Sequence, residues 1–91
     1  MLYNFGNILK KQGKLQEAVQ AYNKALKLNP HYFQAHNNIG CIHLEKGNLK
    51  ESLNSFKKAL AITIEDSNVF YNFGNALQKD GNYSKSIEAY K

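Results

Sequence analysis

The sequence predicts an all-α protein in which antiparallel pairs of helices follow one another along the chain. Two observations favour this fold: the chain repeats itself with a period of 34, and apolar residues recur at helical spacing on both sides of regularly placed glycines. The pentapeptide YNFGN at residues 3–7 returns unchanged at residues 71–75, an offset of 68, or twice 34. Shifting residues 1–32 onto 35–66 gives 9 identities, and shifting residues 1–23 onto 69–91 gives 10. The period therefore covers the whole chain, about 2.7 times.

One apolar face predicts the first helix of each period. Leu2, Phe5 and Leu9 fall at i, i+3 and i+7, with Gly6 beside them, which is the spacing of a single helix face. The same pattern recurs one period and two periods further along the chain. It predicts first helices over residues 1–12, 33–46 and 67–80.

A second apolar stripe follows each first helix. In the first period it contains Leu15, Val19 and Tyr22, and its equivalents predict second helices over residues 15–28, 49–62 and 83–91. The two helices of each period are separated by Gly13, Gly47 or Gly81, because glycine adopts the left-handed conformation that closes a helix. Pro30 ends the first pair, since proline cannot continue a helix.

This pattern resembles the tetratricopeptide repeat (TPR), a family whose signature combines large apolar, glycine, alanine, aromatic and proline positions. The residues that carry the resemblance are Leu2, Phe5, Gly6, Leu9, Ala18, Tyr22 and Pro30. The resemblance implies a right-handed superhelix of antiparallel helix pairs. It divides the chain into a first repeat over 1–32 that lacks its first two positions, a second over 33–66, and a third over 67–91 that is truncated in its second helix.

Small residues at fixed positions predict close helix packing. Gly6, Gly40 and Gly74 would let the second helix approach the first, and Ala18, Ser52 and Ser86 would do the same from the other side. We expect Tyr22, Phe56 and Tyr90 to fill the space toward the next repeat. The middle repeat departs from the family pattern because His36, His43 and Ile64 stand where large apolar residues or proline are usual.

The resemblance implies that the first helices line a concave groove, and helix geometry supplies candidates for it. Asn4, Asn7 and Lys11 lie away from the apolar stripe, and asparagine returns at the equivalent positions of later repeats. A carboxamide both donates and accepts hydrogen bonds, so it can pair with the backbone of an extended peptide. The predicted peptide-binding residues are Tyr3, Asn4, Asn7, Lys11, Asn38, Tyr71, Asn72 and Asn75.

The expected partner is an extended segment of another protein. Lys10, Lys11 and Lys79 favour mildly acidic sequences. The asparagines are similar to the asparagine ladder in the repeat arrays of O-GlcNAc transferases; a groove of merely solvated amides is the alternative. Asn7 and Asn38 also resemble the family's carboxylate clamp, but Tyr3, Asn68 and Asn72 occupy the positions where that clamp has lysine or arginine.

Composition excludes several other classes of function. The net charge is +5 and all 12 basic residues are lysines, which disfavours the bidentate arginine contacts typical of nucleic-acid readers. RNA binding by the helical repeat remains an alternative. The single cysteine, Cys41, cannot form an internal disulfide and fits a reducing, cytoplasmic compartment. We expect no signal peptide and no membrane-spanning segment.

No catalytic or cofactor motif is present, so we expect no enzyme activity and no cofactor. His36 and His43 share a helix face, but Cys41 points about 140° away from His36, so the three do not converge on a metal ion. We expect both histidines to be partly buried and hydrogen-bonded. Ile87 and Tyr90 would lie on an uncovered repeat end. We therefore expect the chain to be a fragment of a longer repeat protein. The alternative is a structural function in which the chain self-associates end to end.

Overall fold

The computed structural model describes residues 2–63 and 65–79, and every regular element within them is a helix. The five helices are α1 (Leu2–Lys11), α2 (Leu15–Leu28), α3 (Phe33–Glu45), α4 (Leu49–Ile62) and α5 (Ser67–Lys79). The ends of each lie within one position of those of a predicted helix, which confirms the all-α fold. The predicted sixth helix, 83–91, lies outside the described residues.

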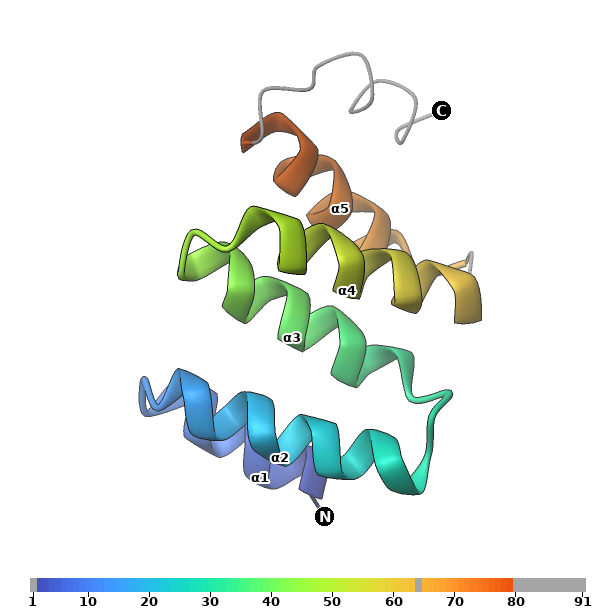
Figure 1. Ribbon diagram of the computed structural model, residues 1–91. Coiled ribbons are helices and arrows are strands. Elements are labelled where there is room, and N and C mark those ends of the chain that lie inside the picture. Colours follow the sequence, from blue (N-terminus) through green and yellow to red (C-terminus); the bar gives the residue numbers. More distant parts are fainter. Residues whose placement is uncertain (1, 64, 80–91) are drawn as a thin grey trace.

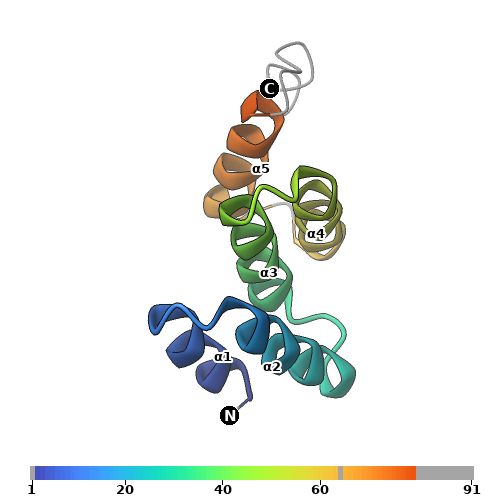
Figure 2. The same ribbon diagram turned by 60° about the vertical axis from the view of Figure 1, so that its left-hand side comes forward.

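The helices are arranged as stacked antiparallel pairs. α1 packs on α2 and α3 on α4, while α2 contacts α3 and α4 contacts α5, so that each pair stacks on the next (Figure 1). α3 also contacts α5 directly. In Figure 2, α2 and α4 each lie to the right of the first helix of their pair. First helices therefore follow one another on one side of the array, and second helices on the other.

Two glycines close the first helix of each complete pair, as predicted. Gly13 and Gly47 have φ values of +80° and +81°, in the left-handed region that favours glycine. The next backbone N–H then reaches back to the helix: Lys14 N donates to Leu9 O at 2.9 Å, and Asn48 N to His43 O at 2.8 Å. These bonds satisfy helix-end carbonyls while the chain reverses. Gly81 lies outside the described residues.

Contacts between an aromatic ring and a glycine hold the first and second pairs together. A Cβ placed on Gly6 would lie 2.7 Å from Tyr22 Cε1, and one on Gly40 would lie 2.7 Å from Phe56 Cε1. Tyr22 and Phe56 have no exposed surface. The predicted close approach of the two helices is thus confirmed for the first and second pairs. Ser52, also fully buried, adds a hydrogen bond from its Oγ to Gly40 O at 2.9 Å.

The connections between pairs end and start helices by local chemistry. α2 ends at Leu28, shortly before Pro30, as a proline break requires. The carboxylate of Asp66 accepts hydrogen bonds from Asn68 N at 2.9 Å and from Val69 N at 3.3 Å. Asp66 therefore caps the N-terminus of α5. Ile64, in the same connection, lies outside the described residues.

Candidate functional site

Four polar side chains from three helices form one hydrogen-bonded cluster. The Tyr22 hydroxyl donates to Asn7 Oδ1, which also accepts from Asn38 Nδ2 at 3.2 Å. Asn38 Nδ2 donates to the Tyr3 hydroxyl at 2.9 Å and lies 3.5 Å from the Tyr22 hydroxyl. Asn38 belongs to α3, whereas the other three belong to α1 and α2. The cluster therefore joins the first pair to the second.

Aromatic rings pack beside this cluster. The ring centroid of Tyr3 lies 5.6 Å from that of Tyr22 and 4.6 Å from that of Tyr32. Burial, together with the neighbouring Tyr3 hydroxyl, raises the pKa of Tyr22 to about 12, while the hydrogen bond to Asn38 acts in the opposite direction. Sequence reasoning missed Tyr32, because it stands in the turn before α3, outside both apolar stripes.

The cluster forms one wall of a groove on the side of the first helices. A cavity of about 310 Å³ is lined by Asn7, Lys10, Lys11, Asn38 and Glu45. Three of the predicted peptide-binding residues, Asn7, Lys11 and Asn38, thus meet in one cavity. Lys10 and Glu45 complete it, with two positive charges and one negative charge in total.

The other predicted residues do not share this cavity. Asn4 is exposed on α1, and Tyr71 is 62% exposed on α5. Asn72 Nδ2 donates to Asn37 Oδ1 at 3.2 Å, an internal contact between α5 and α3. Asn75 is half-buried. Asn4 is therefore exposed, whereas Asn38 and Asn72 are half-buried and each donates to the preceding repeat, although the three occupy equivalent sequence positions.

Cys41 lies beside the groove and is kept protonated. Burial raises the pKa of its thiol, and the carboxylate of Glu45 acts in the same direction, whereas Lys10 opposes both. A thiol with a raised pKa is a poor nucleophile. Nothing in this geometry indicates a reactive cysteine.

His36 and His43 line a separate crevice between the first and second pairs. Burial lowers the pKa of both imidazoles. At His36, Lys58 also lowers the pKa and a hydrogen bond with the Pro30 backbone raises it. At His43, Glu51 raises the pKa and Lys46 lowers it further. The expectation of hydrogen bonding fails at one atom: His43 Nδ1 is buried without a partner. Across residues 2–63 and 65–79, no three His, Cys, Asp or Glu side chains are grouped to hold a metal ion.

None of the helices in the described part of the chain is both long and apolar enough to cross a membrane.

Comparison with known proteins identifies the repeat. A family model described as TPR repeat matches residues 6–47 and again residues 40–81, two windows that start one period apart. The structure is similar to that of YrrB, described as a TPR protein with an unusual peptide-binding site, with a TM-score of 0.90 and 30% identity over 97% of this chain. It also resembles MamA, with a TM-score of 0.93 over 98% of this chain at 19% identity, which shows the fold alone.

The chain spans only part of each of these relatives. It covers 45% of YrrB and 52% of MamA. A stretch of 40 residues is 48% identical to human protein O-mannosyl-transferase TMTC1, of which it covers 4%. TPR repeats of this kind indicate a scaffold for protein–protein interaction. With the period, the glycine–aromatic contacts and the family match in agreement, the chain belongs to the tetratricopeptide repeat family.

Proposed function

We propose that this chain is a non-catalytic scaffold that binds an extended segment of a partner protein in the groove of its first helices. The observation that carries the proposal is the 310 Å³ cavity, in which Asn7, Lys11 and Asn38 meet. These side chains come from two successive repeats, so a segment lying across the cavity would contact both.

The amide cluster leaves one donor and one acceptor for such a segment. Within the cluster, Asn7 accepts both of its hydrogen bonds at Oδ1, and Asn38 donates its hydrogen bonds from Nδ2. Among the described residues, neither Asn7 Nδ2 nor Asn38 Oδ1 has a partner. A peptide C=O and N–H would satisfy them. Because the cluster already fixes both amides, little side-chain entropy is lost when the peptide binds.

The charges of the groove favour an acidic segment. Lys10 and Lys11 face one carboxylate, Glu45, so the cavity carries a net positive charge. Each neutral hydrogen bond contributes only about 0.5–1.5 kcal/mol, so a specific ligand needs these charges as well as the amides. Cys41 is a free thiol, which is typical of proteins in a reducing compartment, so we expect the partner in the cytoplasm. The peptide-binding site described for YrrB, which is 30% identical, also supports binding of a peptide.

A direct test measures the binding of three fluorescein-labelled peptides of equal length: acidic, neutral, and acidic with alternate backbone nitrogens methylated. We expect the acidic peptide to bind best. The double substitution Lys10→Glu and Lys11→Glu should weaken its binding by about tenfold or more, because it reverses two charges in the cavity. Methylation of the backbone nitrogens should also weaken binding, since it removes N–H groups that would donate hydrogen bonds to Asn38 Oδ1.

The control for charge is the pair Lys27→Glu on α2 and Lys57→Glu on α4, which changes the net charge equally at two exposed positions that line none of the three cavities. Equal loss of affinity in both double variants would mean that only overall charge attracts the peptide, and would contradict a groove site. Absence of binding by all three peptides would also contradict it.

Self-association through the repeat ends is a second proposed function, carried by a different observation. Phe5 and Ile8, both on α1, are each 53% exposed although they are large and apolar. Such side chains favour burial against another surface. Ile87 and Tyr90, to which the sequence analysis assigns the other end, lie outside the described residues.

A further inference from the structure

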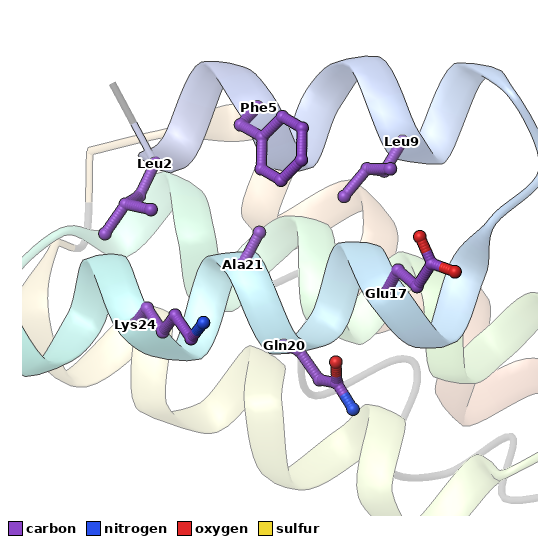
Figure 3. A pocket seen from close by; sticks show the side chains of 7 residues that line it. All are labelled: Leu2, Phe5, Leu9, Glu17, Gln20, Ala21 and Lys24. Carbon is purple, nitrogen blue, oxygen red and sulfur yellow. The ribbon is translucent and has the colours of Figure 1, made fainter.

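A second cavity lies at the outer face of the first helix pair, away from the groove. It has a volume of about 380 Å³. Leu2, Phe5 and Leu9 point into it in a row from α1, and Ala21 points toward them from α2 (Figure 3). Glu17, Gln20 and Lys24 form its polar rim. We call the apolar surface of Leu2, Phe5, Ile8, Leu9 and Ala21 the outer face.

The repeat shows what covers this kind of face inside the molecule. Adding 34 to the number of each residue that lines the outer cavity gives His36, Ile39, His43, Glu51, Asn54, Ser55 and Lys58. All seven line the 200 Å³ crevice between the first and second pairs, and the two further residues there are Val19 and Asn23 of α2. The same face of the second pair is therefore covered by the second helix of the preceding pair.

Exposure of equivalent residues supports this correspondence. Phe5 is 53% exposed, but its equivalent Ile39 is 5% exposed. Ile8 is 53% exposed, but Ile42 and Ala76, its equivalents on α3 and α5, are fully buried. In the described structure, Phe5 and Ile8 are thus exposed at positions that are buried in the stacked second pair.

The chain itself contains a segment that carries the covering pattern. On α2, Tyr22 belongs to a buried cluster that also contains Ala35, Ile39 and Ile42 of α3, and Leu15 and Val19 pack against this cluster. Their equivalents in the third repeat are Tyr83, Ile87 and Tyr90. The stripe of α2 faces α3, and in the same way α4 contacts α5. Tyr83, Ile87 and Tyr90 have the same spacing as the α2 residues that pack toward α3. They could therefore pack in the same way against α1, which is equivalent to α3.

We propose that the outer face binds residues 83–91 of a second copy of the chain, head to tail. This inference rests on the proposed self-association and gives it its two surfaces and its direction. Because the two surfaces differ, each added copy leaves one of each free, so association is open-ended and does not stop at a dimer. The groove residues lie on neither surface, so peptide binding is independent of it.

The test is sedimentation velocity of the complete chain over about a hundredfold range of concentration. We expect the average mass of the wild type to rise beyond that of a dimer. Phe5→Lys and Ile87→Lys should each weaken association by about tenfold or more. An equimolar mixture of the two variants should form a one-to-one dimer and nothing larger, because each variant keeps the surface that the other lacks. Leu28→Lys changes an apolar side chain that is 79% exposed and lines neither cavity, so it should associate as the wild type does.

A site-specific probe separates loss of the interface from loss of the fold. The chain contains no tryptophan, so Phe5→Trp reports on the outer face alone. Its emission should shift to the blue as concentration rises, and adding Ile87→Lys to the same chain should abolish the shift with helicity unchanged by circular dichroism.

The outcomes distinguish two failures. A wild-type chain that stays monomeric at all concentrations would overturn self-association itself. Association that is unaffected by Ile87→Lys, or variants that do not pair when mixed, would overturn only the head-to-tail arrangement.

Discussion

At the scale of single residues, the same side chains serve packing and recognition. Asn7 and Asn38 use one side of their amides to join the first two repeats and leave the other side toward the groove. Tyr22 is the buried centre of this arrangement, because its ring lies against Gly6 and its hydroxyl donates to Asn7. The amides are therefore oriented by the fold before any ligand arrives.

The raised pKa of Tyr22 predicts a loss of stability at alkaline pH. Its pKa is about 12 in the folded chain and about 10 in the unfolded chain, so the unfolded state releases the proton first as the pH rises. The stabilising effect is complete below about pH 10 and is lost toward pH 12. Between these limits the wild type should lose up to about 1.4 kcal/mol per pH unit more than Tyr22→Phe. Urea unfolding at several pH values measures this; parallel pH profiles of the two proteins would contradict it.

At the scale of helices, the first and second pairs each depend on an aromatic ring lying against a glycine. Gly6 and Gly40 meet Tyr22 and Phe56 in the same way, although one ring carries a hydroxyl and the other does not. The contact is made at equivalent positions of two successive repeats, so it belongs to the repeat and not to one site.

Gly6→Ala should destabilise the first pair. The added methyl group would lie 2.7 Å from the ring of Tyr22, which is fully buried and cannot move aside. Overpacking of this kind costs about 1–3 kcal/mol, which exceeds the gain of about 1 kcal/mol in helix propensity. Thermal unfolding followed by circular dichroism checks this. Asn4→Ala, at an exposed position of the same helix, is the control and should change stability little.

The contact between the first two pairs contains two histidines where the repeat elsewhere has apolar residues. His43 is equivalent to Leu9 and Leu77, and both leucines are buried. Its Nδ1 is buried without a partner, and burial lowers the pKa of both His36 and His43. Protonation of either imidazole therefore opposes this contact between the first two pairs.

Stability should fall as the pH drops below the ordinary histidine pKa of about 6.5. Both folded-state pKa values are lowered, so the unfolded chain takes up protons first and is favoured at low pH. His43→Leu should raise stability at about pH 7.5 and reduce the loss at about pH 5, since it removes one titrating group and one unpaired nitrogen. Urea unfolding at both pH values tests this. His31→Leu, at an exposed position, serves as control; a wild type equally stable at both pH values would disprove the prediction.

At the scale of the whole molecule, the five described helices form a linear array in which the first pair packs on the second and the second packs on α5. Its stability is therefore not uniform along the chain. α3 contacts both α2 and α4, whereas Phe5 and Ile8 on α1 are each 53% exposed.

Amide hydrogen exchange should reflect this difference. We expect the amides of α1 to exchange faster than those of α3 at low protein concentration, because fewer buried contacts oppose local opening. Raising the concentration should slow exchange in α1 while leaving α3 unchanged if a second copy covers the outer face. Exchange from α1 as slow as from α3 in the dilute protein would contradict the prediction.

Much of the site could not be predicted from sequence, although the fold could. Asn4, Asn38 and Asn72 occupy equivalent positions, yet only Asn38 lines the groove cavity and only Asn4 is exposed. Asn38 and Asn72 each donate from Nδ2 to the equivalent position of the preceding repeat, which is Tyr3 or Asn37. The difference comes from a neighbour that does not repeat: Asn38 also donates to Asn7, and the residue equivalent to Asn7 in the second repeat is Cys41. A period fixes where a side chain starts on its helix, but not which partner it meets.

The sequence by itself determined the helices, their ends and their pairing. Apolar spacing, Gly13, Gly47 and Pro30 act over short stretches of chain, and Gly6 and Tyr22 meet because they lie on facing stripes of consecutive helices. Only the tertiary structure decided that Asn7 and Asn38 are held by Tyr22, and that Phe5 and Ile8 are exposed while their equivalents Ile39 and Ile42 are buried. The physical reason is that hydrogen-bond geometry and burial depend on residues from three different helices, whose distances are set by stacking and not by local spacing.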